Sequence, residues 1–290
     1  MTVQDFSKKH APVSDMFQMP KTEEDWEAYK LTDEQVAYFH EHGHLSGVQL
    51  LNETQVELLR EELAALTNPN HEGHELFYEY HSNESADPNT VIFHALGHWR
   101  ITKGFHDVLW NPYFRMAAKQ LLKGAVRFWH DQIFSKPAKH GGVVAWHQDY
   151  SYWTRTIEMN HLTCWIALDD ADEQNGCLQY IPGSHRWGLL DKPKLTGEME
   201  GLKKFMTEEQ QKALENPTPV VVKAGQCSFH HPLMVHGSYA NYTDRSRRAF
   251  VINVFKDGVI SNSDEPLLTG VPVIPKGKKI EGQFFPLLLA

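Results

Sequence analysis

His147 and Asp149 are the first residues in this sequence whose types and spacing could bind a metal ion. They stand two positions apart in the run Trp146-His147-Gln148-Asp149, which has the character of a β-strand. Alternate residues of a strand point to the same face, with Cα atoms roughly 6–7 Å apart, so an imidazole and a carboxylate could converge there on one ion. A hydrogen bond between His and Asp inside a core is the alternative interpretation of this short pattern.

A third ligand of the same kind is His236, which follows another β-like run and precedes Gly237 and Ser238. Two histidines and one carboxylate on one face of a metal leave three positions open for other molecules. This donor set suits iron(II), whereas catalytic zinc is more often held by three histidines or by two histidines and a glutamate. The three residues His147, Asp149 and His236 therefore predict a mononuclear iron(II) centre, and we expect them to be catalytic.

Arg247 is the candidate for binding an anion beside that centre. In the strand-like run RRAFVINVF alternate residues share a face, so Arg247 points with Ala249 while Arg248 points the other way. A guanidinium offers a planar fork for a carboxylate, so a buried arginine near the metal could hold a diacid. A solvated surface arginine is the alternative, and this is what we expect of Arg245 in the preceding turn.

Three helices are predicted before this region, after an extended arm over residues 1–30. The first begins at a capping box that starts at Thr32. The second follows Asn52 and carries an apolar stripe at helical spacing, formed by Val56, Leu59, Leu63 and Leu66. The third begins at Asn111-Pro112, because proline is tolerated at a first helical position.

From about Ala125 the chain changes to short β-like runs separated by Gly, Asn and Asp, which predicts a mainly β fold behind a helical support. One interruption, residues 190–216, is predicted to be helical from a capping box at Thr207. We predict a single domain over residues 1–290. Its parts are an arm and helical support (1–124), a β core (125–260) with the insertion 190–216, and a C-terminal extension (261–290).

Acidic residues outnumber Lys and Arg, 37 to 28, which argues against a nucleic-acid partner. The three cysteines are too few and too widely spaced for a disulfide framework, which favours a reducing, cytoplasmic compartment. No stretch approaches the ~18 apolar residues of a membrane-spanning helix. We therefore expect no membrane partner, and the oligomeric state stays open.

Three stretches of the sequence resemble the phytanoyl-CoA dioxygenase-like family of iron(II)/2-oxoglutarate oxygenases. They cover roughly residues 130–255 and read FSKPAKHGGVVAWHQDYSYW, LTCWIALDDADEQNGCLQYIPGSHRWG and HHPLMVHGSYANYTDRSRRAF. The opening KLTDEQVAYFHEHGHLSGVQLL also resembles the usual start of the family. The resemblance implies a double-stranded β-helix, a jelly-roll and cupin-like core, braced by N-terminal α-helices.

The resemblance also assigns cofactors and roles. It implies Fe(2+) on His147, Asp149 and His236, with 2-oxoglutarate and O2 as cosubstrates and ascorbate as a candidate stimulant. Arg247 is implied to pair with the C5 carboxylate of 2-oxoglutarate and Ser238 to help. Trp165 matches an aromatic residue that lines the cosubstrate pocket, and the match of Trp129 to such a position is poorer.

The reaction implied by the resemblance is hydroxylation of a small-molecule substrate, with release of succinate and carbon dioxide. Related halogenases carry Ala or Gly in place of the carboxylate ligand, so Asp149 predicts hydroxylation rather than halogenation. Two other classes stay open: a cupin-like metal enzyme that does not use 2-oxoglutarate, and a catalytically inactive binding module. The intact set of ligands and Arg247 disfavour both.

The residues after the His-x-Asp pattern are the candidates for binding the substrate, namely Tyr150, Tyr152, Trp153 and Arg155. Core packing is the alternative role for the aromatic residues, and Arg155 points weakly to an anionic substrate. The run QDYSYW differs from the SDFETW of ectoine hydroxylases, which argues against ectoine. Residues 70–90 are predicted to be loop-like, and residues 70–100 and 190–216 are predicted to cover the mouth of the barrel.

Overall fold

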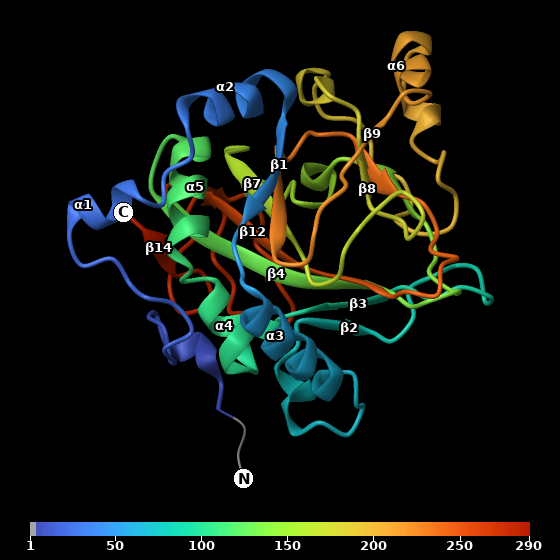
Figure 1. Ribbon diagram of the computed structural model, residues 1–290. Helices are drawn as coiled ribbons and strands as arrows, with labels where there is room; N and C mark the ends of the chain where they lie inside the picture. The colour runs from blue at the N-terminus through green and yellow to red at the C-terminus, as the bar shows by residue number, and fades with distance from the viewer. Residues whose placement is uncertain (1–3) are drawn as a thin grey trace.

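Two antiparallel β-sheets form the centre of the molecule, which a computed structural model describes over residues 4–290 (Figure 1). The larger sheet consists, in spatial order, of β1 (His44–Gln49), β10 (Gln226–His230), β7 (His161–Ala167), β12 (Arg247–Lys256), β4 (Val126–Lys136), β3 (Phe93–Leu96) and β2 (Glu79–His81), with β14 (Leu287–Leu289) also paired to β4. The smaller sheet consists of β5 (Val144–His147), β11 (His236–Ser238), β8 (Leu178–Tyr180) and β9 (Thr218–Pro219). A separate pair joins β13 (Ile260–Ser261) to β6 (Thr156–Ile157).

Strand β12 shows how the sequence divides its side chains between two cores. Ala249 and Val251 belong to an apolar cluster that includes Leu178 and Tyr180 of the smaller sheet, so this face lies between the sheets. Phe250, Ile252 and Val254 belong instead to the cluster shared with the N-terminal helices. Both faces are apolar because both are covered, and the alternation of the strand decides which side chains reach the interior between the sheets.

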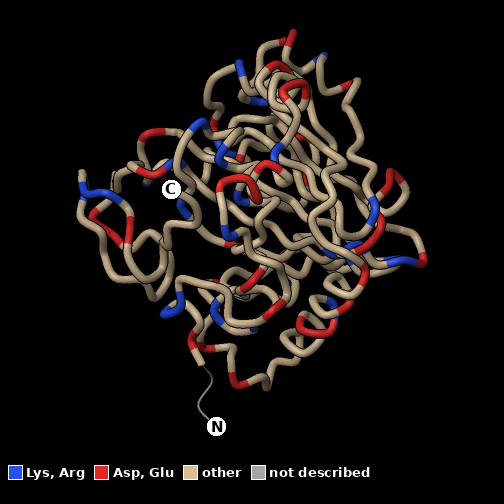
Figure 2. The backbone as a smooth tube through the Cα atoms, turned by 60° about the vertical axis from the view of Figure 1, so that its left-hand side comes forward, with Lys and Arg blue, Asp and Glu red and all other residues tan. Residues whose placement is uncertain are grey.

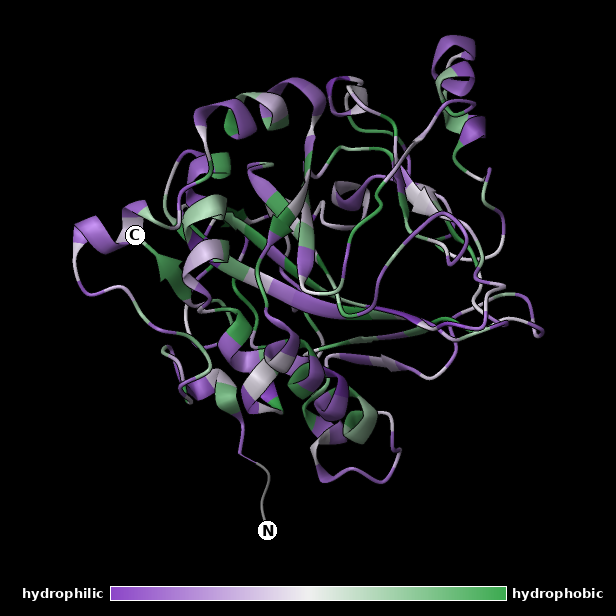
Figure 3. Cartoon of the chain, viewed as in Figure 1, coloured by the Kyte–Doolittle hydropathy of each residue, from purple (hydrophilic) through white to green (hydrophobic). Residues whose placement is uncertain are grey.

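Helices cover the outer face of the larger sheet (Figure 1). They are α2 (Asp33–His42), α3 (Glu53–Leu66), α4 (Lys103–Val108) and α5 (Pro112–Leu122). Capping boxes begin α2 at Thr32 and α3 at Asn52, and Asn111 caps α5 with Pro112 in its first turn, as predicted. The predicted apolar stripe of α3 is buried. Figure 3 shows both hydrophobic and hydrophilic residues on this helix, which is typical of a helix that packs against the protein on one side only.

Three local predictions were incomplete. The arm predicted over residues 1–30 contains a short helix, α1 (Glu23–Glu27), which a capping box at Thr22 begins. Helix α4 was missed because it spans little more than one turn and has no side-chain cap. The loop predicted over residues 70–90 includes β2, which pairs with β3 and extends the larger sheet.

The insertion 190–216 packs on the outer face of the smaller sheet. It contains α6 (Glu208–Ala213), which begins at the predicted capping box of Thr207. Leu202, Met206 and Leu214 form one apolar cluster with Trp146 of β5. The insertion is therefore attached directly behind the strand that carries His147. The division of the chain into one domain with these parts stays a prediction.

Charged residues of both signs are interspersed along the chain (Figure 2). Within residues 4–290, no helix combines the length and the apolar character that crossing a bilayer requires. The three cysteines are buried free thiols.

Acid sensitivity is expected from buried histidines. Burial lowers the pKa of five of them to about 4 or about 3, namely His44, His98, His130, His161 and His231. A histidine whose folded pKa lies below its unfolded value of about 6.5 takes up a proton only on unfolding, so stability falls as pH drops below about 6.5. At about pH 5.5 each of these histidines lowers the free energy of unfolding by roughly 1.4 kcal/mol, and the five together lower it by roughly 7 kcal/mol. This sum is comparable to the whole stability of a domain. We expect the melting temperature to fall steeply below about pH 6.

His98→Phe is the variant that tests this linkage. The ring of His98 is fully buried beside Phe77 and Phe105, and neither ring nitrogen has a hydrogen-bond partner among the described residues. The variant should take up about one proton fewer on unfolding than the parent protein. The slope of its free energy of unfolding against pH should therefore be smaller by roughly 1.4 kcal/mol per pH unit between about pH 4 and 6. Denaturant titrations at several pH values measure this slope. A slope unchanged from that of the parent protein would contradict the account.

Candidate metal centre

His147 and His236 are brought together by direct strand pairing. His147 ends β5, His236 begins β11, and the two residues are partners in the antiparallel register of the smaller sheet. Their ring centroids lie 4.1 Å apart. Asp149 does not lie on the same strand, as the sequence had predicted, but at the start of a 3-10 helix, η4 (Asp149–Tyr152). This turn still brings its Oδ1 to 3.5 Å from the Nε2 atom of each histidine.

Hydrogen bonds fix which nitrogen of each histidine can bind a metal. His147 Nδ1 lies 2.7 Å from the carbonyl oxygen of Ala145, and His236 Nδ1 lies 2.9 Å from that of Met234. Since a carbonyl can only accept, Nδ1 donates in both rings, and Nε2 keeps its lone pair toward the space shared with Asp149.

The protonation states also suit a cation. Burial, together with the neighbouring His147, holds the pKa of His236 well below its usual range, so the ring is neutral. Burial alone would raise the pKa of Asp149, but the neighbouring His236, His147 and His230 side chains hold it well below its usual range. Two histidines and one carboxylate thus offer ligand atoms that all lie within 4.8 Å of one another. These residues fit a divalent first-row metal.

Arg247 is a buried cation in the same cavity. Its side chain is among the largest that are fully buried, at 1% exposure. Nε donates to the carbonyl of Gly176, Nη2 to Ser238 Oγ at 3.4 Å, and Nη1 has no partner among the described residues. Burial lowers its pKa to about 10, so it remains charged at neutral pH. The guanidinium lies 5.6 Å from the ring centroid of Trp165. A fully buried charge with an unpaired donor fits an anionic ligand.

Lys136, which lies directly beside Arg247, is one of the residues that sequence reasoning missed. It ends β4 directly opposite Arg247, is fully buried, and donates to Ser238 Oγ at 2.6 Å. Burial and the nearby Arg247 hold its pKa well below its usual range. The alternation of β4 places Lys136 on the face of His130, Gln132 and Phe134, but only the pairing with β12 brings it to Arg247.

One cavity of about 330 Å³ is lined by the three candidate metal ligands and by Arg247. Of the predicted substrate residues, Tyr152, Trp153 and Arg155 line it, and so does Trp129. Tyr150 does not, because its hydroxyl is bonded to the carbonyl of Thr156. Both terminal nitrogens of Arg155 donate to backbone carbonyls, those of Pro266 and Leu267, so its charge is already engaged.

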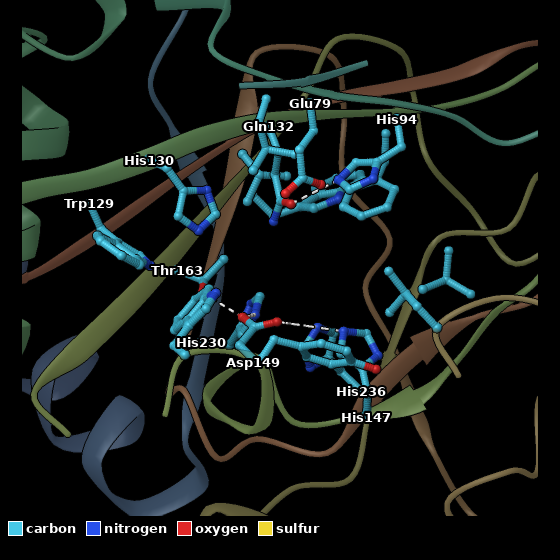
Figure 4. Close-up of a pocket in the computed structure, with 18 of the residues that line it drawn as sticks. Glu79, His94, Trp129, His130, Gln132, His147, Asp149, Thr163, His230 and His236 are labelled. Carbon is cyan, nitrogen blue, oxygen red and sulfur yellow. Dashed lines mark hydrogen bonds and ion pairs between the residues drawn. The ribbon is translucent and has the colours of Figure 1, made fainter. Parts of the chain in front are cut away.

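The wall opposite the metal ligands is polar (Figure 4). Glu79, His94 and Gln132 point into the cavity from β2, β3 and β4. His94 Nδ1 lies 2.6 Å from the carboxylate of Glu84, and Nε2 lies 3.1 Å from the side-chain oxygen of Gln132. Sequence reasoning missed this wall because it treated the β2 region as a loop.

Comparison with known proteins identifies a family for this chain. The family profile described as "Phytanoyl-CoA dioxygenase (PhyH)" matches residues 39–249. "Phytanoyl-CoA dioxygenase domain-containing protein 1" of Bos taurus is 36% identical over 146 residues, which span 49% of this chain and 49% of that relative. This match thus covers about half of the relative's length. "Phytanoyl-CoA dioxygenase" of Arabidopsis thaliana is 25% identical over 264 residues, covering 77% of this chain and 88% of the relative.

Solved structures share the fold over nearly the whole chain. The non-heme alpha ketoglutarate dependent carbocyclase SnoK from nogalamycin biosynthesis superposes with a TM-score of 0.72 and 23% identity, covering 93% of this chain and 99% of its own. EctD from S. alaskensis, solved with 2-oxoglutarate and 5-hydroxyectoine, gives a TM-score of 0.68 and 17% identity, covering 97% and 93%. The predicted mainly β, double-stranded β-helix fold is confirmed. Because the family profile covers more than half of the sequence, this chain belongs to the phytanoyl-CoA dioxygenase (PhyH) family of iron(II)/2-oxoglutarate-dependent oxygenases, as its motifs predicted.

Proposed function

We propose that this protein hydroxylates a small molecule in a reaction that depends on iron(II), 2-oxoglutarate and O2. One observation carries the proposal: two histidines and a carboxylate share a single cavity with a buried arginine that has an unpaired donor among the described residues. Neither the set of candidate metal ligands nor the buried arginine would suffice alone. A metal set without an anion site would suit many metal enzymes, whereas the combination matches what a 2-oxo diacid needs at its two ends.

The metal ligands are proposed to be His147, Asp149 and His236, each through the atom that the hydrogen bonds leave free. Iron(II) held there would supply the oxidising chemistry, with release of succinate and carbon dioxide. The protein contributes position, because each histidine ring is fixed by the backbone carbonyl two residues before it. It also contributes a largely buried site, since the three ligands are each less than a tenth exposed.

The cosubstrate is proposed to bind with its far carboxylate on Arg247. Nη1 is free to donate, while Ser238 Oγ lies between Arg247 Nη2 and Lys136 Nζ and is oriented by both. Trp165 closes one side of this pocket. A buried carboxylate with these donors would be held through charge-assisted hydrogen bonds, which are the stronger kind.

The substrate is proposed to lie between the metal ligands and the polar wall of β2–β4. Tyr152 and Trp153 form part of its surroundings, and Glu84 and His94 face it from the opposite side. We do not propose ectoine, despite the structural likeness to EctD, because the residues after Asp149 differ from those of ectoine hydroxylases. A cytoplasmic location, which the buried free thiols support, is part of the same proposal.

The direct assay of this function is formation of succinate from 2-oxoglutarate in air. Iron(II)-loaded protein should form succinate slowly without substrate and faster with a substrate found by metabolite screening. Ascorbate is expected to prolong this activity. Metal-dependent activity on a substrate without any 2-oxoglutarate consumption would favour the cupin-like alternative, and tight substrate binding without turnover would favour the inactive binding module.

The two segments that border the mouth of the cavity are expected to respond to ligand. Glu84, between β2 and β3, lines the cavity. Leu195 of the insertion also lines it, and its carbonyl accepts a hydrogen bond from the backbone N–H of Ala145 in β5. Hydrogen exchange should therefore slow in residues 82–92 and 190–206 when iron(II) and 2-oxoglutarate are added without oxygen.

The exchange experiment contains its own control. Strand β3 is buried and paired with β4, so its amides should be protected with or without ligand, although the sequence had placed them within a lid over 70–100. Strong and equal protection of residues 82–92 and 190–206 in both states would contradict a lid role.

A further inference from the structure

The two oxygens of the Asp149 carboxylate have different surroundings. Oδ1 lies 3.5 Å from Nε2 of both His147 and His236. Oδ2 accepts a hydrogen bond from Thr163 Oγ1 at 2.6 Å and lies 2.9 Å from His230 Nε2 (Figure 4). One oxygen is thus directed to the metal site, and the other is occupied by two side chains of the larger sheet.

His230 is itself held by a chain of hydroxyl groups. The Tyr180 hydroxyl lies 2.9 Å from His230 Nδ1 and 2.9 Å from Ser228 Oγ, which in turn lies 2.8 Å from Ser46 Oγ. A carboxylate can only accept, so His230 Nε2 donates to Asp149 and Nδ1 is left to accept from Tyr180. The hydroxyl chain therefore selects the ring tautomer that donates to Asp149.

This series of hydrogen bonds connects the two sheets, and its members nearest to Asp149 are internal. His230 and Ser228 lie on β10 and Tyr180 on β8, and all three are at most 1% exposed. The rings of His230 and His236 are 4.4 Å apart, yet His230 is not part of the group of side chains whose ligand atoms converge. His230 faces the carboxylate and not the metal position.

We propose that His230 is a positioning residue that, together with Thr163, keeps Asp149 a one-oxygen ligand of the metal. This inference rests on the proposed metal site. If both oxygens of Asp149 bound the metal, they would occupy one more of the positions that a diacid cosubstrate and O2 need. Tying Oδ2 to two donors prevents this, and it also fixes the direction of Oδ1. Loss of a hydrogen bond to a residue that ligates a metal typically changes the metal affinity about 10–100-fold.

The test compares His230→Phe with the matched control His44→Phe. Both histidines are buried, and the ring of His44 packs 4.8 Å from that of Tyr180, but its nitrogens have no hydrogen-bond partner among the described residues. Metal affinity is measured by competition with a chromophoric chelator, using Co(II) as the probe. The visible absorption of the Co(II) protein reports coordination, and 2-oxoglutarate is then titrated into the Co(II)-loaded protein.

For His230→Phe we expect Co(II) affinity to fall about 10–100-fold, a changed Co(II) absorption spectrum, and weaker 2-oxoglutarate binding. His44→Phe should resemble the parent protein in all three. His230→Gln, which can still donate an N–H, should recover part of the loss. If His230→Phe does not fold, Thr163→Val removes the other donor to Oδ2 at little change in volume and is expected to shift the same three measurements.

Two results would overturn the inference. Parent-like Co(II) affinity and spectrum in folded His230→Phe would mean that the hydrogen bond is only a core contact. Complete loss of Co(II) binding in that folded variant, with no recovery in His230→Gln, would mean that His230 is itself a ligand. Failure of the proposed function looks different: the parent protein would bind Co(II), and 2-oxoglutarate would not bind to the Co(II)-loaded protein.

Discussion

His236→Ala is expected to abolish stable metal binding and, with it, formation of succinate. The variant removes one of the three proposed protein ligands and leaves Asp149 and His147 at the other two positions. We expect metal affinity to fall by more than about 100-fold, or roughly 3 kcal/mol. Equilibrium dialysis with iron(II) or Co(II) measures the affinity, and the 2-oxoglutarate conversion assay measures turnover.

His140→Ala is the control, because His140 is exposed and lies outside the cavity lining. It should leave metal affinity and turnover unchanged. Stability must be compared as well, since removal of a buried side chain can unfold part of a sheet. A folded His236→Ala protein that binds metal as tightly as the parent would place the metal site elsewhere in the chain.

Arg247→Ala is expected to raise the 2-oxoglutarate concentration needed for half-saturation. Removing the partner of a buried carboxylate costs on the order of 2–5 kcal/mol, which is roughly 30-fold to several-thousand-fold in affinity. Metal affinity should change little, because Arg247 contacts Gly176 and Ser238 and none of the three ligands. The measurement is the apparent affinity for 2-oxoglutarate of the iron(II)-loaded variant.

Two neighbouring arginines are matched controls for this result. Arg245 is half-exposed and pairs with Asp172, an interaction worth roughly 0–1 kcal/mol, so Arg245→Ala should leave 2-oxoglutarate affinity unchanged. Arg248 points to the opposite face and pairs with both oxygens of Asp169, so Arg248→Ala should affect stability rather than affinity. If Arg248→Ala weakened cosubstrate binding while Arg247→Ala did not, the assignment of the pocket would be wrong.

The strand register at Arg247 could be predicted because the relevant information is local. A run of apolar residues with period two fixes which side chains share a face, and the structure confirms that Arg247 and Ala249 point to the interior between the sheets. Helix starts were equally local, since capping boxes at Thr32, Asn52 and Thr207 are visible as short patterns. The three proposed metal ligands, two histidines and one aspartate, could be picked out because they stand within motifs that resemble those of the family.

What could not be predicted depends on contacts between distant parts of the chain. Lys136 reads as an ordinary exposed lysine at a strand end, and only the pairing of β4 with β12 buries it against Ser238. His230 reads as one more histidine in a His-His-Pro run, and its partner Tyr180 lies on the other sheet. The polar wall of Glu79, His94 and Gln132 was likewise hidden, because β2 and β3 have too few residues to show an alternation.

The central claim is that one cavity binds iron(II) and 2-oxoglutarate together. Anaerobic titration of 2-oxoglutarate into the iron(II)-loaded protein, followed by visible absorption, tests it most directly. The account predicts a weak charge-transfer band that saturates at about one 2-oxoglutarate per protein and is absent in His236→Ala. Absence of the band from fully iron-loaded parent protein, or its persistence at full intensity in His236→Ala, would contradict the account.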